Sequence, residues 1–470
     1  GEEEGFLLIV PTMVRTGVRP LTTIVIPVFV TVPAGRSPVE LTMVFAEVAG
    51  QVFSFPVKVR LFPQDHSTLE ILQYIQGDPP DIATELRQGK YLLLEIDISN
   101  LAVDNQERFP LTITARATVD AREKEVAVST TAVVQTLPRP VGWYAGDGHM
   151  HTKWSPDCLF ISIDQRARSS VNRGLQWVVI TDHSSGIGNN WGAYVAECNR
   201  AQKERDLLVL PGFECTARSK DGSSDFLGYA CHEQGRSIPG DKSLEGQELV
   251  AEIGRHRAPH SYAALAHPLR SRGGDAPGVT GYRGLEVLNA QTRASDKVID
   301  RWFHLLRSGL RQTIKSGEFV VGIGNSDSHN FWGPGDMGIT WVYPTSDVQQ
   351  RNAIWEAIRA GRVSVSGVGD FGCFTINGYP QGSVVTVRTD GKLEFRLVQQ
   401  PVAGHHCSKI IIYQQDQTSL KVFTDPSITE TEFSTTAAST DTFYLVRVEF
   451  KDSHREVYDV WSNPIFVTVA

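Results

Sequence analysis

The first part of the chain alternates short apolar runs with turn residues. The runs are rich in Val, Ile, Thr and Phe and show little helical periodicity. This spacing is typical of antiparallel strands and predicts an immunoglobulin-like β-sandwich over residues 1–138. The strands are expected at 6–10, 22–32, 39–48, 53–61 and 91–98. Pro138 and Pro140 then disfavour both helix and sheet and indicate a linker.

Residues 142–367 follow a different pattern, in which strand-like and helix-like segments alternate. Strands are expected at 176–181, 207–211, 226–231, 262–266, 284–289 and 319–323. Helices are expected at 194–205, 244–257, 295–315 and 348–360. This alternation predicts a parallel sheet with helical crossovers, and roughly 225 residues is the size of a closed βα barrel.

Residues 370–470 return to strand-like runs, at 373–377, 392–398, 409–414, 442–450 and 464–469. They predict a second, smaller β-sandwich. The chain is therefore expected to have three domains, an α/β domain between two β-sandwiches. A length of 470 residues agrees with several domains of ordinary size.

Composition excludes some classes of protein. Hydrophobic residues make up 41% and charged residues 21%, as in folded globular proteins. The net charge of −8 disfavours binding to a nucleic-acid backbone, so no nucleic-acid partner is expected. The longest apolar stretch, 22–33, is broken by Pro27 and is too short to span a membrane. The chain begins with Gly rather than Met, and we expect a trimmed start.

The six cysteines lack a C-x-x-C pair or dense spacing, so they are expected to be small buried hydrophobic residues. The histidines and carboxylates of the middle segment have a clearer pattern, because they fall at predicted strand ends. In His149-Met150-His151 both imidazoles would lie on one face of an extended strand. The carboxyl ends of barrel strands meet at one mouth, so these groups are expected to converge. The other strand-end groups are Asp182, His183, Glu214, His232, His267, Asp327 and His329.

Each of these groups also has a structural interpretation taken alone. Asp182 and Asp327 could be helix N-caps, and His267 could be a packed core histidine. The joint pattern nevertheless predicts a metal centre. Imidazole and carboxylate donors without thiolates suit Zn, Mn or Fe ions, and there are more donors than one tetrahedral ion can use. We therefore expect two or three divalent metal ions, which would lower the pKa of a shared water and neutralise a substrate oxygen.

These segments, in this order, resemble the PHP (polymerase and histidinol phosphatase) superfamily over roughly residues 143–338. The resemblance implies a distorted (βα)7 barrel with a two- or three-metal centre. It implies that His149, His151, Glu214 and Asp327 hold one ion, that Glu214 is shared with a second ion bound by His267, and that Asp157, His183 and His329 hold a third. Asp147 and Asp182 resemble the family's acids that accept the free N–H of ligating imidazoles.

The sequence departs from the family pattern at two places. Asp157 stands in Ser155-Pro156-Asp157, where the family has Ser-Asp-Gly. The family usually has a histidine before Leu-Gly, whereas this chain reads Asp225-Phe226-Leu227-Gly228. Asp225 or His232 could complete the second metal site, or the second ion could be absent.

The flanking segments also carry resemblances. Ser462-Asn463-Pro464-Ile465 is similar to the ending of long PHP proteins related to carbaryl hydrolase, and the N-terminal sandwich resembles macroglobulin-type domains. Both sandwiches could equally be packing or spacer modules without chemistry. Because such sandwiches are common outside the cell, a secreted or periplasmic location is slightly favoured over the cytoplasm.

Three functions are compatible with the sequence. The first is a phosphoesterase in which a metal-bridging hydroxide attacks a small phosphorylated ester, with Asp147, Asp182 and Arg270 as catalytic candidates. Lys153 and Arg218 are further candidates for gripping phosphoryl oxygens. The second is a carbamate or carboxylic-ester hydrolase, and the third a non-catalytic, metal-stabilised binding or adhesion protein. Aromatic residues beside the predicted metal-binding loops would favour an aryl substrate, or belong to the core: Trp154, Trp191, Phe331 and Trp332. The oligomeric state is left open.

Overall fold

The structure is a computed structural model that describes most of the chain. The described residues are 4–18, 20–75, 89–103, 107–158, 161–203, 205–218, 224–231, 238–255, 261–269, 276, 278–289, 295–329, 333–347 and 351–470. His232, Arg270, Phe331 and Trp332 lie outside them, so the predictions made for these four residues stay predictions.

Contacts divide the chain into two compact units. The first combines residues 1–136, 151–174 and 328–334, and the second combines 137–150, 175–327 and 335–470. One boundary falls between His149 and His151, and another directly follows Asp327. The predicted metal-binding groups are therefore divided between the two units.

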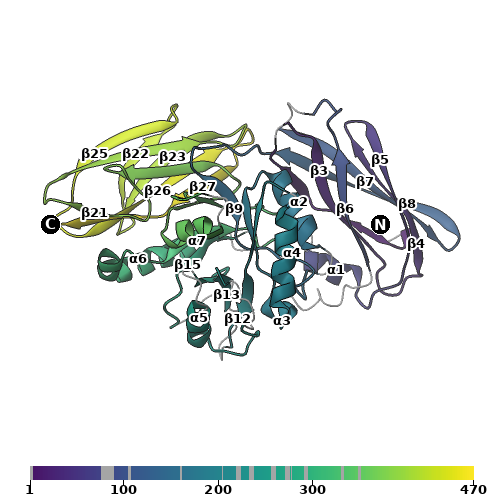
Figure 1. The fold of residues 1–470 in the computed structure, drawn as a ribbon. Coiled ribbons are helices and arrows are strands. Elements are labelled where there is room, and N and C mark those ends of the chain that lie inside the picture. The colour runs from purple at the N-terminus through teal and green to yellow at the C-terminus, as the bar shows by residue number, and fades with distance from the viewer. Residues whose placement is uncertain are drawn as a thin grey trace. The chain divides into compact units, whose positions relative to one another are not determined.

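The first unit contains the predicted N-terminal β-sandwich (Figure 1). One sheet has the order β1 (Leu7–Ile9), β3 (Thr23–Thr31), β6 (Gly89–Asp97). The other has the order β2 (Met13–Thr16), β8 (Arg122–Val134), β7 (Arg108–Val119), β4 (Val39–Val48), β5 (Gln51–Leu61). Buried and less buried residues alternate along β7, and the inner faces of both sheets share one apolar core.

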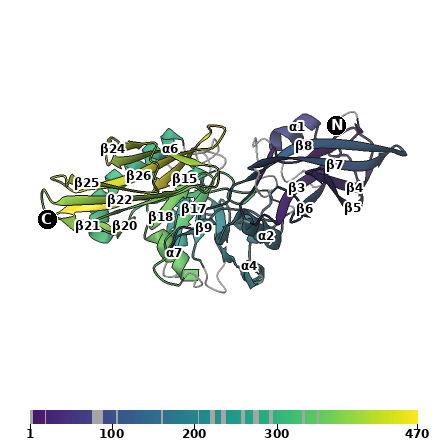
Figure 2. The ribbon, with the colours of Figure 1, turned by 90° about the horizontal axis from the view of Figure 1, so that it is seen from above.

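Two helices belong to this unit, α1 (Thr68–Ile75) and α2 (Ile163–Arg173). Helix α2 begins with a capping box, in which the Ser162 hydroxyl accepts from the Gln165 N–H and the Gln165 side chain accepts from the Ser162 N–H. It ends at Gly174, whose φ of 90° lies in the left-handed region that glycine adopts without strain. Figure 2 shows α2 beside β3 and β6 of the sandwich.

The second unit begins with a parallel arrangement of three strands. The order β11 (Leu208–Pro211), β10 (Trp177–Ile180), β9 (Tyr144–Asp147) is followed by antiparallel β17 (Ile339–Val342) and β18 (Val363–Ser366). A second sheet has the order β12 (Phe213–Thr216), β13 (Asp225–Tyr229), β14 (Tyr262–Leu265), β15 (Gly284–Asn289), β16 (Val321–Asn325). Its β13 is antiparallel to both neighbours, and the last three strands are parallel.

Helices alternate with these strands much as the sequence predicts. They are α3 (Ser184–Ile187), α4 (Trp191–Lys203), α5 (Gly246–Arg255), α6 (Asp296–Ser316) and α7 (Arg351–Arg359). A closed seven-stranded barrel is not shown, because among the described residues no backbone ladder joins β16 to β17. The Thr340 hydroxyl connects these strands instead, since it contacts both the N–H and the C=O of Gly324.

The C-terminal strands form a second sandwich, as predicted (Figure 1). The first sheet of this unit continues from β18 through β27 (Val457–Ser462), β26 (Thr442–Lys451) and β23 (His406–Gln414) to β24 (Ser419–Thr424). Two more strands join it, β28 (Ile465–Val469) and β21 (Val384–Val387). The opposing sheet has the order β20 (Tyr379–Pro380), β19 (Phe371–Ile376), β22 (Lys392–Gln400), β25 (Glu430–Thr436). A helix of the length and hydropathy that a bilayer crossing requires does not occur in the described part of the chain.

Candidate metal centre

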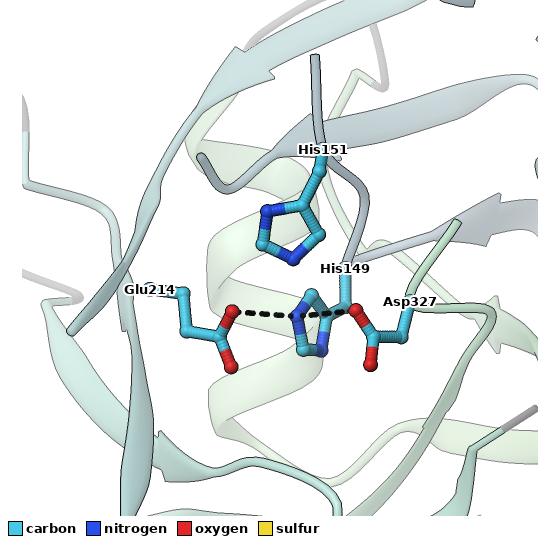
Figure 3. Close-up of side chains that lie close together, drawn as sticks. All are labelled: His149, His151, Glu214 and Asp327. Carbon is cyan, nitrogen blue, oxygen red and sulfur yellow. Dashed lines mark ion pairs between the residues drawn. The ribbon is translucent and has the colours of Figure 1, made fainter. Parts of the chain in front are cut away.

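In the second unit, three buried side chains from separate strand ends meet. His149 follows β9, Glu214 lies in β12 and Asp327 follows β16, and each is at most 2% exposed. The Nε2 atom of His149 lies 3.3 Å from Oε2 of Glu214 and 3.2 Å from Oδ1 of Asp327. Figure 3 shows the two carboxylates on either side of the His149 ring. This arrangement offers one imidazole and two carboxylate donors to a single ion.

Glu214 also faces a second imidazole with its other oxygen. Oε1 of Glu214 lies 2.9 Å from Nε2 of His267, and Oδ2 of Asp225 lies 3.7 Å from the same nitrogen. The donor atoms of Glu214, Asp225 and His267 all lie within 4.8 Å of one another. Asp225 is therefore close enough to Glu214 and His267 to share an ion with them, whereas His232, the other candidate, lies outside the described residues.

His183 completes the surroundings of Glu214. Its Nε2 lies 3.5 Å from Oε2 of Glu214, and its side chain is 19% exposed. An isolated parallel bridge pairs the backbones of His183 and Glu214. The resemblance grouped His183 with Asp157 and His329, and that grouping stays a prediction; within the second unit, the imidazole of His183 lies beside Glu214.

The backbone is strained at two of these positions. His267 has a φ of 24° and Asp327 a φ of 52°, in the left-handed region that side chains other than glycine rarely adopt. Such conformations cost on the order of 1–3 kcal/mol each and cluster at functional sites. Both residues turn the chain directly after a strand, where β14 and β16 end.

A carboxylate that the sequence analysis did not single out holds this cluster. Glu286 is completely buried in β15, and its Oε1 lies 2.8 Å from Nδ1 of His149. Its Oε2 accepts from the backbone N–H of His267 at 2.7 Å. The amides of Asn289 and Asn325 donate to Glu286 as well. The signal was present, because Glu286 is the one charged residue in the run 284–289.

Asp147 has a different role from the one expected. It accepts from the backbone N–H groups of His149, Ser326 and Gly335 and from the Ser326 hydroxyl. The imidazole N–H of His149 faces Glu286 instead. Burial raises the pKa of Asp147 to about 6, although these hydrogen bonds oppose the shift. Asp147 therefore fixes the backbone on both sides of Asp327.

The backbone of Asp182 lines the same region. Its N–H donates to the Tyr194 hydroxyl at 3.2 Å, and its C=O accepts from the N–H of Glu214 at 3.0 Å. The side chain of Asp182 is completely buried. Its backbone therefore helps to fix the position of Glu214.

The charges of the cluster change the protonation of its members. Burial alone would lower the pKa of both His149 and His267. Carboxylates outweigh burial and raise the pKa of His149 well above its ordinary value; these are Asp327, Glu286 and Glu214. A hydrogen bond that His267 donates to Glu214 likewise raises the pKa of His267. Burial, and then the negative charge of Glu214, raises the pKa of Asp225.

The first unit holds a separate donor set. His151, Asp157 and His329 have donor atoms within 4.8 Å of one another. Nε2 of His329 lies 3.1 Å from Oδ2 of Asp157, and the rings of His151 and His329 stack with centroids 4.3 Å apart. Nδ1 of His151 contacts the Ser155 hydroxyl at 2.8 Å, so Nε2 is the atom of this imidazole that would ligate a metal ion. Asp157, which stands one residue later than the Asp of the family's Ser-Asp-Gly motif, thus lies close to two of the histidines predicted as ligands.

Imidazole and carboxylate groups are the donors that Zn, Mn and Fe ions use, so all three donor sets fit a divalent metal. The described cysteines do not contribute to these sets: all six are present as thiols, and five are buried. The predicted substrate contacts are less well supported. Arg218 is 58% exposed and lies 3.9 Å from Glu245, and Trp191 is packed in the core against Tyr194 and Phe213.

Comparison with known proteins gives little further guidance. No family model matches the chain, and no curated protein matches it. A solved structure from Bifidobacterium adolescentis, provisionally described as a metal-dependent phosphoesterase, is 16% identical, with a TM-score of 0.28, over 40% of this chain and 89% of that one. A β-glucuronidase of Parabacteroides merdae is 9% identical with a TM-score of 0.20, and this chain spans 64% of its length. A bacterial ice-binding adhesin is 10% identical, with a TM-score of 0.16 over 99% of each chain. Similarities this low carry no argument about fold or activity.

Proposed function

We propose that this chain is a metal-dependent hydrolase of the PHP type that acts on a small phosphate ester. The observation that supports this most directly is the position of Glu214. Its two oxygens face two different imidazoles, at 3.3 Å from His149 and 2.9 Å from His267. A carboxylate placed in this way suits two neighbouring ions, which is the arrangement that metal-dependent phosphoesterases use.

Three donor sets would hold the divalent ions under this proposal. They are His149, Glu214 and Asp327; Glu214, Asp225 and His267; and His151, Asp157 and His329. Ions bound at these sets would lower the pKa of a bound water and would place positive charge next to the substrate oxygen that becomes negative during hydrolysis. Zn and Mn are the first metals to test.

The protein's own groups orient these donors. Glu286 holds Nδ1 of His149, so Nε2 is left facing Glu214 and Asp327. Asp147 holds the backbone around Asp327. A cysteine nucleophile is disfavoured, because burial raises the pKa of the Cys198 and Cys215 thiols far above neutral pH.

The test compares three substrate classes. The purified protein is loaded with Mn²⁺ or Zn²⁺ and assayed for nitrophenol release from a phosphate monoester, a phosphate diester, and a carbamate or acetate ester. The variants are His149→Ala and Asp327→Ala, and His304→Ala, an exposed histidine on α6, is the matched control.

We expect phosphate turnover that falls to background in His149→Ala and Asp327→Ala and is unchanged in His304→Ala. Turnover of only the carbonyl esters would assign the chain to the carbamate or carboxylic-ester hydrolases. Wild-type activity in Asp327→Ala would contradict the proposed centre.

A further inference from the structure

A buried arginine in the first unit contacts both segments that carry histidine donors. Arg166 lies on α2 and is 1% exposed. Its Nε and Nη2 atoms donate to the C=O of His151 at 3.1 and 2.8 Å. Nη2 also donates to the C=O of Ser328 at 3.3 Å and of His329 at 2.9 Å. One guanidinium thus holds the backbone of two histidines that are far apart in the sequence.

The contact has a geometric consequence for the donors. The N–H of His151 donates to the C=O of Ser328 at 2.9 Å, so the two segments run side by side at this point. The His151 and His329 rings stack directly beyond it, 4.3 Å apart. Arginine suits this position because its planar fork reaches several acceptors at once, whereas a lysine ammonium acts as a single point charge.

Helix α2 is itself fixed to the N-terminal sandwich. The N–H of Gly17 donates to the C=O of Asn172 at 3.1 Å, and Nη1 of Arg173 donates to the C=O of Gln135 at 3.2 Å. A side chain at position 17 would collide with the helix, because a Cβ there would lie 2.4 Å from the C=O oxygen of Arg173.

Apolar packing continues this attachment. Cys158 and Ile161, on the segment that leads into α2, share a buried cluster with side chains of the sandwich and α1. The sandwich members of that cluster include Phe29 and Tyr91. Arg168 adds a paired contact to Glu95, with its Nη1 2.9 and 3.0 Å from the two carboxylate oxygens.

We propose that Arg166 is a positioning residue for the metal site of His151, Asp157 and His329, and that α2 gives this site the support of the N-terminal β-sandwich. The inference rests on the proposed function for the claim that these donors hold an ion. It assigns the sandwich a role beyond that of a spacer. The placement of the two segments by Arg166 can be tested without a metal.

The experiment uses the full chain with Arg166→Gln, Arg166→Lys and the control Arg60→Gln. Arg60 is an exposed arginine on β5 of the same unit. Hydrogen exchange of the metal-free proteins reports on peptides that cover 151–158 and 328–334. Zn²⁺ titration then gives the number of bound equivalents in each variant, in His329→Ala and in the double variant Arg166→Gln/His329→Ala.

We expect faster hydrogen exchange in both peptides for Arg166→Gln, a smaller increase for Arg166→Lys, and wild-type exchange for Arg60→Gln. The affinity for one Zn²⁺ equivalent should fall about 10- to 100-fold in Arg166→Gln, as for other groups that orient metal ligands. The double variant should lose no more than His329→Ala alone. Unchanged exchange, or equal effects in Arg166→Gln and Arg60→Gln, would overturn the inference. Absence of Zn²⁺ binding in the wild type would instead overturn the proposed function.

Discussion

The orientation of His149 depends on a single buried carboxylate. Glu286 accepts from the imidazole and from the backbone N–H of His267. Replacing it in Glu286→Gln keeps the size of the side chain but removes the charge that fixes the imidazole. We expect metal affinity to fall about 10- to 100-fold, measured by competition with a chromophoric chelator. The control is Glu248→Gln, an exposed position on α5, and equal affinities in the two variants would contradict the assignment.

The raised pKa values of His149 and His267 make metal uptake pH-dependent. In the metal-free protein both imidazoles are stabilised as cations by nearby carboxylates. Because the folded pKa values lie above the unfolded one, this stabilisation is complete below about pH 6.5 and is lost as the pH rises through the folded values. A metal ion must displace these protons, so its affinity should increase with pH over that window.

Calorimetry in buffers of different ionisation enthalpy measures the protons released for each ion. His149→Gln should release about one proton fewer than the wild type at neutral pH. A binding enthalpy that is independent of the buffer would show that the imidazoles are already neutral.

The donors could be predicted from the sequence because their types and strand-end positions are local features. His149, Glu214, His267 and Asp327 meet in the structure as that pattern implies, and Asp225, which was singled out only by the departure from the family motif, lies beside them. The residues that orient them could not be recognised as easily. The partners of Glu286 and Arg166 come from distant segments, and no local pattern identifies which buried charge contacts which backbone.

At the scale of elements, the sequence indicates strands and long amphipathic helices best. The predicted helix 295–315 corresponds to α6 (Asp296–Ser316), whose Ser295 cap accepts from the N–H of Val298. Helix α2 was not predicted, because its mean hydropathy is low and its buried residues include Arg166, Ser170 and Arg173. The antiparallel direction of β13 was also missed, since periodicity does not reveal the direction of a strand.

One short motif connects the C-terminal strands to the candidate centre. Oδ1 of Asn463 accepts from the N–H of Gly322 at 2.8 Å, and its Nδ2 donates to the C=O groups of Gly322 and Val363. Gly322 lies in β16, the strand that leads to Asp327. Asn463→Ala removes the amide from the buried N–H and C=O of Gly322, whereas the C=O of Val363 keeps its bonds from Gln381 and from the backbone N–H of residue 463. The loss should cost about 2–4 kcal/mol of unfolding free energy in denaturant titration. Asn100→Ala, in an exposed turn, should change it by less than about 0.5 kcal/mol, and equal effects would contradict this role.

At the scale of the molecule, each of the three domains predicted from the sequence is one continuous segment, whereas the two compact units are each built from several segments. The first unit takes segments 151–174 and 328–334 from the middle of the sequence. The assignment of these segments to the first unit depends on tertiary contacts rather than on composition. Examples are the hydrogen bonds of Gly17 to Asn172 and of Arg173 to Gln135. The two sandwiches, in contrast, were predictable because alternation along single strands reveals them.

The sheet that runs from β9 through β18 into β27 predicts how the second unit responds to truncation. Three residue pairs join β18 to β27, including Val365 with Trp461. A chain that ends at residue 367 would expose β18 as an open edge and would lose the Asn463 contacts to β16. We expect the truncated chain to aggregate or to unfold without a cooperative transition, and to lose metal from the two donor sets that contain Glu214. Size-exclusion chromatography, thermal circular dichroism and metal analysis, each compared with the full chain, measure these three outcomes. A truncated chain that is monodisperse, melts cooperatively and binds the full complement of metal would contradict this prediction, because it would show that the centre forms without the C-terminal sandwich.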